Sequence, residues 1–245
     1  MIDKVKESTQ VSVVHYDIDE LVQLVQSNLD ANRKMLIFRI GDDAARANYL
    51  ELEGLAKNKY CQDRLLPWAK KRGYIHLMTR DKSITWLNDV ITSLKTADVV
   101  GVLDYSDEAI LSPKNDKRPA LDALLKRHNI KLTATCDSAL SRKIYKHESF
   151  WNLLYNNKYA VISNPEYIES YKAYTVSHEK NVLGNLVQTV IKTADVSLDD
   201  IYKEVLSIPC QLILYCIGIY KYELYKHDFG NKVLFDIGQM FIKVK

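Results

Sequence analysis

The sequence lacks the short motifs that identify the common nucleotide-binding and hydrolytic enzymes. Its 245 residues contain no G-x-G-x-x-G, no G-x-x-x-x-G-K-[ST], no G-x-S-x-G and no H-E-x-x-H. These absences exclude a glycine-rich dinucleotide loop, a P-loop, a nucleophile elbow and a helical zinc-peptidase site. Five Pro and eight Gly are too few for a collagen-like or proline-rich chain.

Long apolar stretches are missing too, and we expect no signal peptide. The longest apolar run, Leu212–Ile219, is far shorter than the roughly 20 residues that span a bilayer. The opening MIDKVKESTQ has no apolar core of a signal peptide. The four cysteines have no C-x-x-C or Cys–His spacing of a zinc site. We therefore predict reduced core thiols, a cytoplasmic location and no integral membrane segment.

Charge is nearly balanced. With 34 Lys and Arg against 31 Asp and Glu, the net charge is +3, too small to indicate a nucleic-acid partner. The chain is 47% apolar and 27% charged, as globular proteins are. Its length fits one large domain or two small ones. We predict a single α/β domain over residues 1–245.

Apolar runs alternate with amphipathic segments along the chain. The predicted strands are Met35–Ile40, Ala97–Leu103, Ile130–Thr135, Tyr159–Ser163, Gln211–Ile217 and Lys232–Phe235, with a short one at Tyr174–Ser177. The predicted helices are Asp19–Ser27, Ala44–Leu55, one ending at Val90–Leu94, Ala120–His128, a region from Ser138 to about Tyr155, Asp199–Leu206 and Tyr220–Lys226. The weak periodicity of Asn181–Thr193 fits either a helix or a connection. This alternation predicts a mostly parallel, Rossmann-like sheet with helices on both faces.

Acidic residues and glycines follow the predicted strands. They are Gly41, Asp42, Asp43, Asp104, Asp137, Gly218, Asp236 and Gly238. Parallel strands place their carboxyl ends at one sheet edge, where ligands of open α/β sheets bind. Carboxylates there can hold a divalent cation or act as a general base, and glycines allow a phosphate to approach the backbone. The alternative is that each Asp only caps the following helix and that Gly218 only forms a tight turn.

Three segments resemble the GT-D fold glycosyltransferases, a bacterial family. They are Phe38–Asp43 (FRIGDD), Asp137–Arg142 (DSALSR) with Phe150–Leu154 (FWNLL), and Leu214–Gly218 (LYCIG) with Phe235–Gln239 (FDIGQ). Their order agrees with the family over about residues 15–242. The resemblance implies transfer of a sugar from a nucleotide-sugar donor to a glycan or glycoprotein acceptor. It also implies a D-x-E motif that serves a metal–diphosphate site at the first strand end.

The chain departs from this motif, because Asp42 matches the first acid but Ala44 replaces the second. The family pattern then assigns a divalent metal such as manganese to Asp42. On this interpretation we predict phosphate binding by Arg39, Gly41, Asp42, Arg46, Arg142 and Gly218, and general-base catalysis by Asp43 or Asp137. Three outcomes stay open: another Asp completes the metal site, cations stabilise the leaving group, or the protein binds without catalysing. A different Rossmann-like nucleotide-binding enzyme is the remaining alternative. If the metal site is functional, Ala44→Glu is expected to raise its affinity for manganese.

Overall fold

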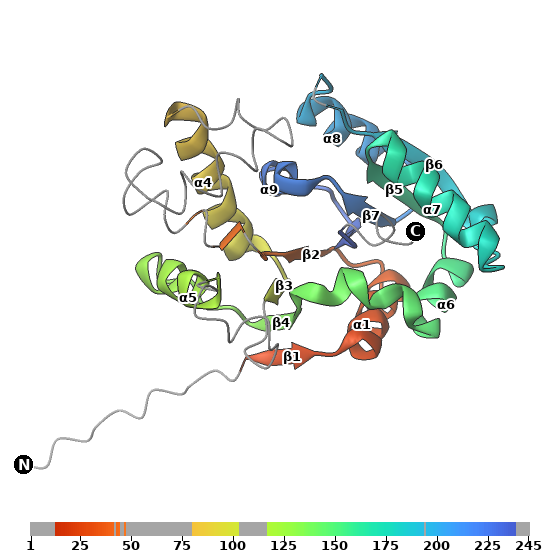
Figure 1. Ribbon diagram of the computed structural model, residues 1–245, viewed down its shortest axis with the longest axis horizontal. Coiled ribbons are helices and arrows are strands. Elements are labelled where there is room, and N and C mark those ends of the chain that lie inside the picture. The colour runs from red at the N-terminus through yellow and green to blue at the C-terminus, as the bar shows by residue number, and fades with distance from the viewer. Residues whose placement is uncertain are drawn as a thin grey trace, which may run out of the picture.

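The structure is a computed structural model that describes residues 13–41, 43–44, 47, 80–102, 117–193 and 195–238. In these ranges, eight strands form one parallel sheet in the order β1-β4-β3-β2-β8-β7-β5-β6 (Figure 1). The predicted α/β class with a parallel sheet is confirmed.

The strands are β1 Val14–Tyr16, β2 Met35–Arg39, β3 Val99–Val102, β4 Ala134–Asp137, β5 Tyr159–Ser163, β6 Leu186–Ile191, β7 Leu212–Cys216 and β8 Val233–Asp236. The α-helices are α1 Ile18–Asp30, α4 Arg80–Thr96, α5 Lys117–Arg127, α6 Glu148–Asn156, α7 Pro165–Ser177, α8 Leu198–Ser207 and α9 Lys221–Leu224. Short 3-10 turns are η3 Ser138–Arg142, η4 Ile144–Lys146, η5 Leu183–Asn185 and η6 Gly218–Tyr220.

Helices cover both faces of the sheet. Successive strand residues point to opposite sides, so each interior strand contributes side chains to two cores. In β2, Leu36 and Phe38 join the core under α4, α5, α8 and α9. Met35 and Ile37 join a second core under α1, α6 and α7. Figure 1 shows α4 and α1 on opposite sides of β2. Burial on both faces explains why the interior strands are continuous apolar runs.

Most predicted elements are confirmed. The near-continuous apolar runs predict interior strands, and five of the strands that the sequence predicts lie in the interior of the sheet: β2, β3, β4, β5 and β7. β5 has the predicted bounds. Ser197 caps α8, since its Oγ accepts a hydrogen bond from the backbone N–H of Asp200 at 3.1 Å. Of the predicted Ala44–Leu55 helix, only Ala44 and Ala47 lie among the described residues, and both are helical.

Three predictions about the elements need correction. The predicted strand from Ile130 begins only at Ala134, where pairing with β1 and β3 starts; Ile130 packs in the core without joining the ladder. Tyr174–Ser177 is the last turn of α7 and not a strand. That helix is set at its start by the Asn164 cap and by Pro165 in the first turn. Asn181–Thr193 contains the edge strand β6. Its residues differ in burial without a regular alternation, so the sequence does not show the two-residue apolar period of a strand.

Candidate functional site at the carboxyl edge of the sheet

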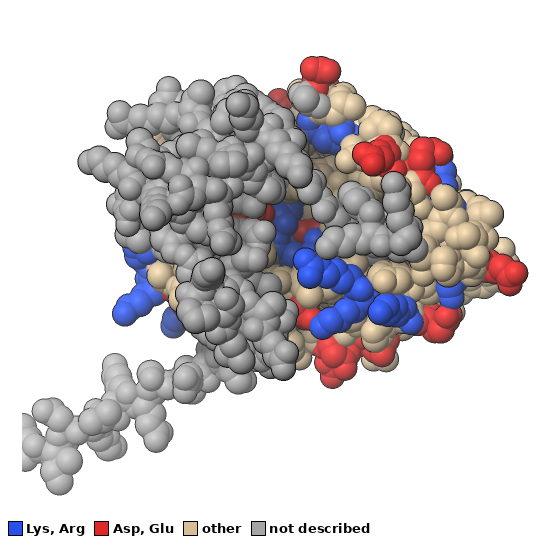
Figure 2. Space-filling view, in the orientation of Figure 1, with Lys and Arg blue, Asp and Glu red and all other residues tan. Residues whose placement is uncertain are grey.

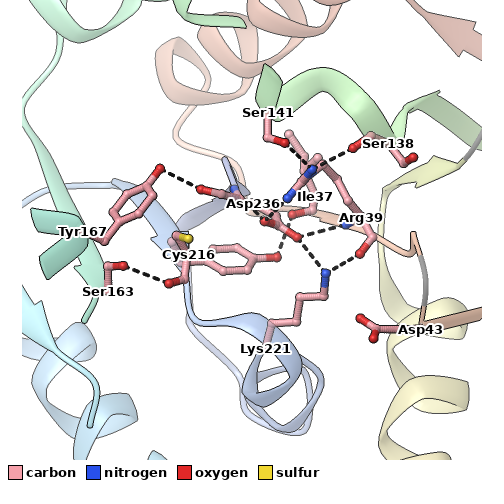
Figure 3. Close-up of polar contacts among 12 residues, drawn as sticks. Ile37, Arg39, Asp43, Ser138, Ser141, Ser163, Tyr167, Cys216, Lys221 and Asp236 are labelled. Atoms are coloured by element: carbon pink, nitrogen blue, oxygen red, sulfur yellow. Dashed lines mark hydrogen bonds and ion pairs between the residues drawn. The ribbon is translucent and has the colours of Figure 1, made fainter. Parts of the chain in front are cut away.

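Asp236, the last residue of β8, lies at the centre of a hydrogen-bonded cluster (Figure 3). Its Oδ2 accepts hydrogen bonds from the backbone N–H of Arg39 and from Nζ of Lys221, both at 3.1 Å. Its Oδ1 accepts from Nη2 of Arg39 at 3.3 Å and from the backbone N–H of Gly238 at 2.9 Å. Lys221 also donates to the carbonyl oxygen of Arg39. One carboxylate therefore ties together the ends of β2 and β8 and the start of α9.

The cluster is buried and charged. Asp236 is 2% exposed. Burial alone would raise the pKa of its carboxyl, but the charges of Arg39 and Lys221 outweigh this and hold the pKa below its ordinary value. Burial alone would lower the pKa of Arg39, yet the neighbouring carboxylate raises it. Arg39 and Asp236 thus stabilise each other in their ionised forms.

Arg39, predicted to bind phosphate, uses its guanidinium to hold η3. Its Nη1 donates to the carbonyl oxygen of Ser138 at 2.6 Å and to Oγ of Ser141 at 2.7 Å. Two glycines make room for it. A Cβ on Gly101 would lie 2.6 Å from Cγ of Arg39, and a Cβ on Gly238 would overlap Nη2. This geometry favours a structural role for Arg39.

Asp137, predicted as a general base, ends β4 and caps η3. Its Oδ1 accepts a hydrogen bond from the backbone N–H of Ala139 at 2.7 Å, and its Oδ2 pairs with Nζ of Lys143 at 2.7 Å. The alternative capping role is therefore confirmed. The side chain remains 27% exposed, so a base role at this position stays a prediction.

Asp43, the other predicted base, points toward α9. Its side chain is buried, and Oδ2 accepts a hydrogen bond from the hydroxyl of Tyr222 at 2.7 Å. The next residue, Ala44, is 1% exposed and belongs to the core that α4 and α9 cover. The third position of the degenerate D-x-E motif thus faces apolar side chains.

Some of the remaining predicted residues lie at this edge, and the others lie outside the described part of the chain. Gly218 opens η6 with a φ of +59°, which favours glycine, and Gly41 has open space where a Cβ would stand. Arg142 is exposed at the end of η3. Strand direction places these residues, with Arg39, Asp43 and Asp137, at the same edge of the sheet. Three predicted residues lie outside the described part of the chain: Asp42, Arg46 and Asp104.

The described carboxylates at this edge do not fit a divalent-cation site. Asp236 faces two cations, Asp137 pairs with Lys143, and Asp43 accepts the Tyr222 hydroxyl. Nowhere in the described ranges do three His, Cys, Asp or Glu side chains stand close enough together to hold a metal. Manganese takes several oxygen ligands at once, and these carboxylates are separately engaged.

Sequence reasoning missed Lys221, Tyr222 and Ser141. Both α9 residues lie in a run of alternating Lys and Tyr that carries no motif, and their roles depend on how α9 packs under β2. Ser141 is one of many serines, and its contact with Arg39 spans 102 residues of sequence. The sequence signal that did exist was Asp236-Ile237-Gly238 at the end of β8, which marks the centre of the cluster.

The fold and this edge define a class of protein: an open, parallel α/β sheet with a polar, charged cluster where its central strands end. The model of the GT-D-like family, described as a GT-D fold-like domain, matches residues 16–244. The chain belongs to this family. No curated protein and no solved structure shows a significant match to it. None of the helices in the described ranges has both the length and the apolar character needed to cross a membrane.

Proposed function

We propose that this protein transfers a sugar from a nucleotide-sugar donor to a hydroxyl of a glycan or glycoprotein acceptor. The observation that carries the proposal is the family match over residues 16–244. The ligand-binding edge of such a sheet supports it, because glycines, cations and carboxylates gather there. We keep the prediction of a cytoplasmic protein, which the buried, unpaired thiols of Cys136, Cys210 and Cys216 support.

The proposed chemistry requires a general base and a neutralised leaving group. The acceptor oxygen forms a bond to the anomeric carbon while the bond from that carbon to the diphosphate oxygen breaks. A carboxylate takes the proton of the acceptor hydroxyl, and the nucleoside diphosphate leaves with the electron pair. Asp137 is the better placed base, because its carboxylate is partly exposed whereas Asp43 is buried under Tyr222.

The first experiment is a thermal-shift panel of nucleoside diphosphates and nucleotide-sugars. A bound ligand raises the melting temperature by mass action. A nucleotide-sugar that stabilises the protein is then assayed for release of its nucleoside diphosphate. If no nucleotide or nucleotide-sugar raises the melting temperature, the proposal fails.

The second experiment separates catalysis by Asp137 from its capping role. Asp137→Asn keeps a capping oxygen but cannot accept the proton, so it should lower turnover by two orders of magnitude or more (about 10²–10⁴-fold) and leave donor affinity nearly unchanged. Asp17→Asn is the matched control, since the Asp17 carboxylate likewise accepts a hydrogen bond from a backbone N–H in the first turn of its helix, α1. Equal turnover in the two variants would exclude Asp137 as the base.

A binding protein that no longer catalyses is the second candidate. The engagement of Asp43, Asp137 and Asp236 by internal partners favours it. It predicts a nucleotide-sugar that raises the melting temperature but is neither hydrolysed nor transferred. Another Rossmann-like enzyme would instead be stabilised by a dinucleotide or a methyl donor.

A further inference from the structure

Carboxylates and cations at the carboxyl edge of the sheet differ in their surroundings. Each described carboxylate that ends a strand there already has a cation or hydroxyl within hydrogen-bonding distance. Several cations beside them are exposed. Arg142 ends η3, Lys143 follows it, and Lys146 ends η4, and all three are exposed. Figure 2 shows Lys and Arg side chains gathered over this η3–η4 segment.

The backbone that carries these cations is held firmly. Arg39 holds η3 through hydrogen bonds to the carbonyl oxygen of Ser138 and to Oγ of Ser141. Farther along, Nε1 of Trp151 donates to the carbonyl oxygen of Tyr145 at 2.8 Å, and Ile144 is fully buried. A fixed backbone reduces the entropy lost when long side chains order around an anion. The buried charge cluster therefore supports an exposed basic surface, which we call the η3–η4 cation surface: Arg142, Lys143 and Lys146.

We propose that the η3–η4 cation surface binds the diphosphate of the donor directly, without a divalent metal. This inference rests on the proposed function. A diphosphate presents several anionic oxygens, and charge-assisted hydrogen bonds from guanidinium and ammonium groups are strong. Arg142 can engage two oxygens at once, and Lys146, at the end of η4, adds a point charge. Lys143 shares its charge between Asp137 and the ligand.

The test is calorimetric titration with the nucleoside diphosphate that gives the largest thermal shift, and with inorganic pyrophosphate. Each titration is run in excess chelator and again with manganese. The variants are Arg142→Gln, Lys146→Gln and the double substitution. Lys95→Gln is the matched control, since Lys95 is exposed in the last turn of α4, at the opposite edge of the sheet.

Wild type should bind the nucleoside diphosphate equally well in chelator and in manganese. Each single variant should bind about five-fold more weakly, as expected for an exposed charge-assisted contact, and the double variant about 25-fold. Lys95→Gln should bind like wild type. Rising salt should weaken wild-type binding more than binding by the double variant.

Two results would overturn this inference and leave the proposed function standing. One is binding that occurs only with manganese, which would place a carboxylate–metal site at this edge. The other is metal-free binding that the Arg142 and Lys146 variants leave unchanged, which would place the diphosphate elsewhere. If no nucleoside diphosphate binds under either condition, the proposed function fails together with the inference.

Discussion

Asp236→Asn removes one negative charge from the central cluster and leaves its shape almost unchanged. A carboxylate has two acceptor oxygens, whereas an amide has one oxygen and a donating NH2 group. Each oxygen of Asp236 faces two donors: Arg39 N–H and Lys221 Nζ on one side, Arg39 Nη2 and Gly238 N–H on the other. In either orientation the NH2 group therefore opposes two donors, and Arg39 and Lys221 lose their shared counter-ion.

Asp236→Asn should lower the free energy of unfolding by about 3–5 kcal/mol, the range for removing one partner from a buried ion pair. For a chain of this size, that lowers the melting temperature by roughly 10 °C. Asp228→Asn is the matched control. Asp228 pairs with Lys34 at 3.5 Å, and their side chains are 79% and 48% exposed. A surface pair of this kind contributes under about 1 kcal/mol.

Urea unfolding followed by far-UV circular dichroism measures both variants. Equal costs for Asp236→Asn and Asp228→Asn would refute the reasoning, because they would show that the cluster does not depend on the carboxylate. A loss of more than about 3 kcal/mol for Asp236→Asn, with little change for Asp228→Asn, is the expected result.

The Asp236 carboxylate also makes the free energy of unfolding depend on pH. Its folded pKa lies below the unfolded value, which is about 3.9 for Asp. Its contribution to stability is therefore fully present above that pH and is lost as the pH falls through the folded pKa. Below about pH 4 the wild type should lose stability more steeply than Asp236→Asn. Parallel slopes of unfolding free energy against pH would contradict this assignment.

Two further predictions concern packing. Gly101→Ala should cost about 1–3 kcal/mol, because its Cβ would meet Cγ of Arg39, whereas Gly184→Ala has open space and should cost almost nothing; equal unfolding midpoints would contradict the close contact. Burial raises the pKa of the described cysteine thiols to between about 11 and about 12. In a Cys61→Ser background the native protein should therefore show no fast-reacting thiol toward a disulfide reagent at pH 8, and a fast one would mean that a core thiol opens to solvent.

The interior of the fold could be predicted because its strands are buried on both faces, and a buried strand is a continuous apolar run. The strands at the two edges of the sheet could not. β1 is only three residues long and exposes Val14, while β6 exposes Val187 and Ile191 beside the buried Val190. Edge strands have no such uniform environment, so their apolar period is weak. Strand direction alone was enough to bring Asp137 and Asp236 to the same edge.

What a motif does not reveal is the direction of a side chain, and position 44 shows the consequence. By the motif, Ala44→Glu restores a carboxylate and should raise manganese affinity. In the structure, Ala44 is 1% exposed and packs in the core with residues of α4 and α9. A glutamate there would be enclosed by apolar side chains, where an unpaired carboxylate costs several kcal/mol. We therefore expect Ala44→Glu to lower the melting temperature sharply and to leave manganese affinity unchanged in calorimetry. A stably folded Ala44→Glu protein that binds manganese more tightly than wild type would show that position 44 turns toward the site.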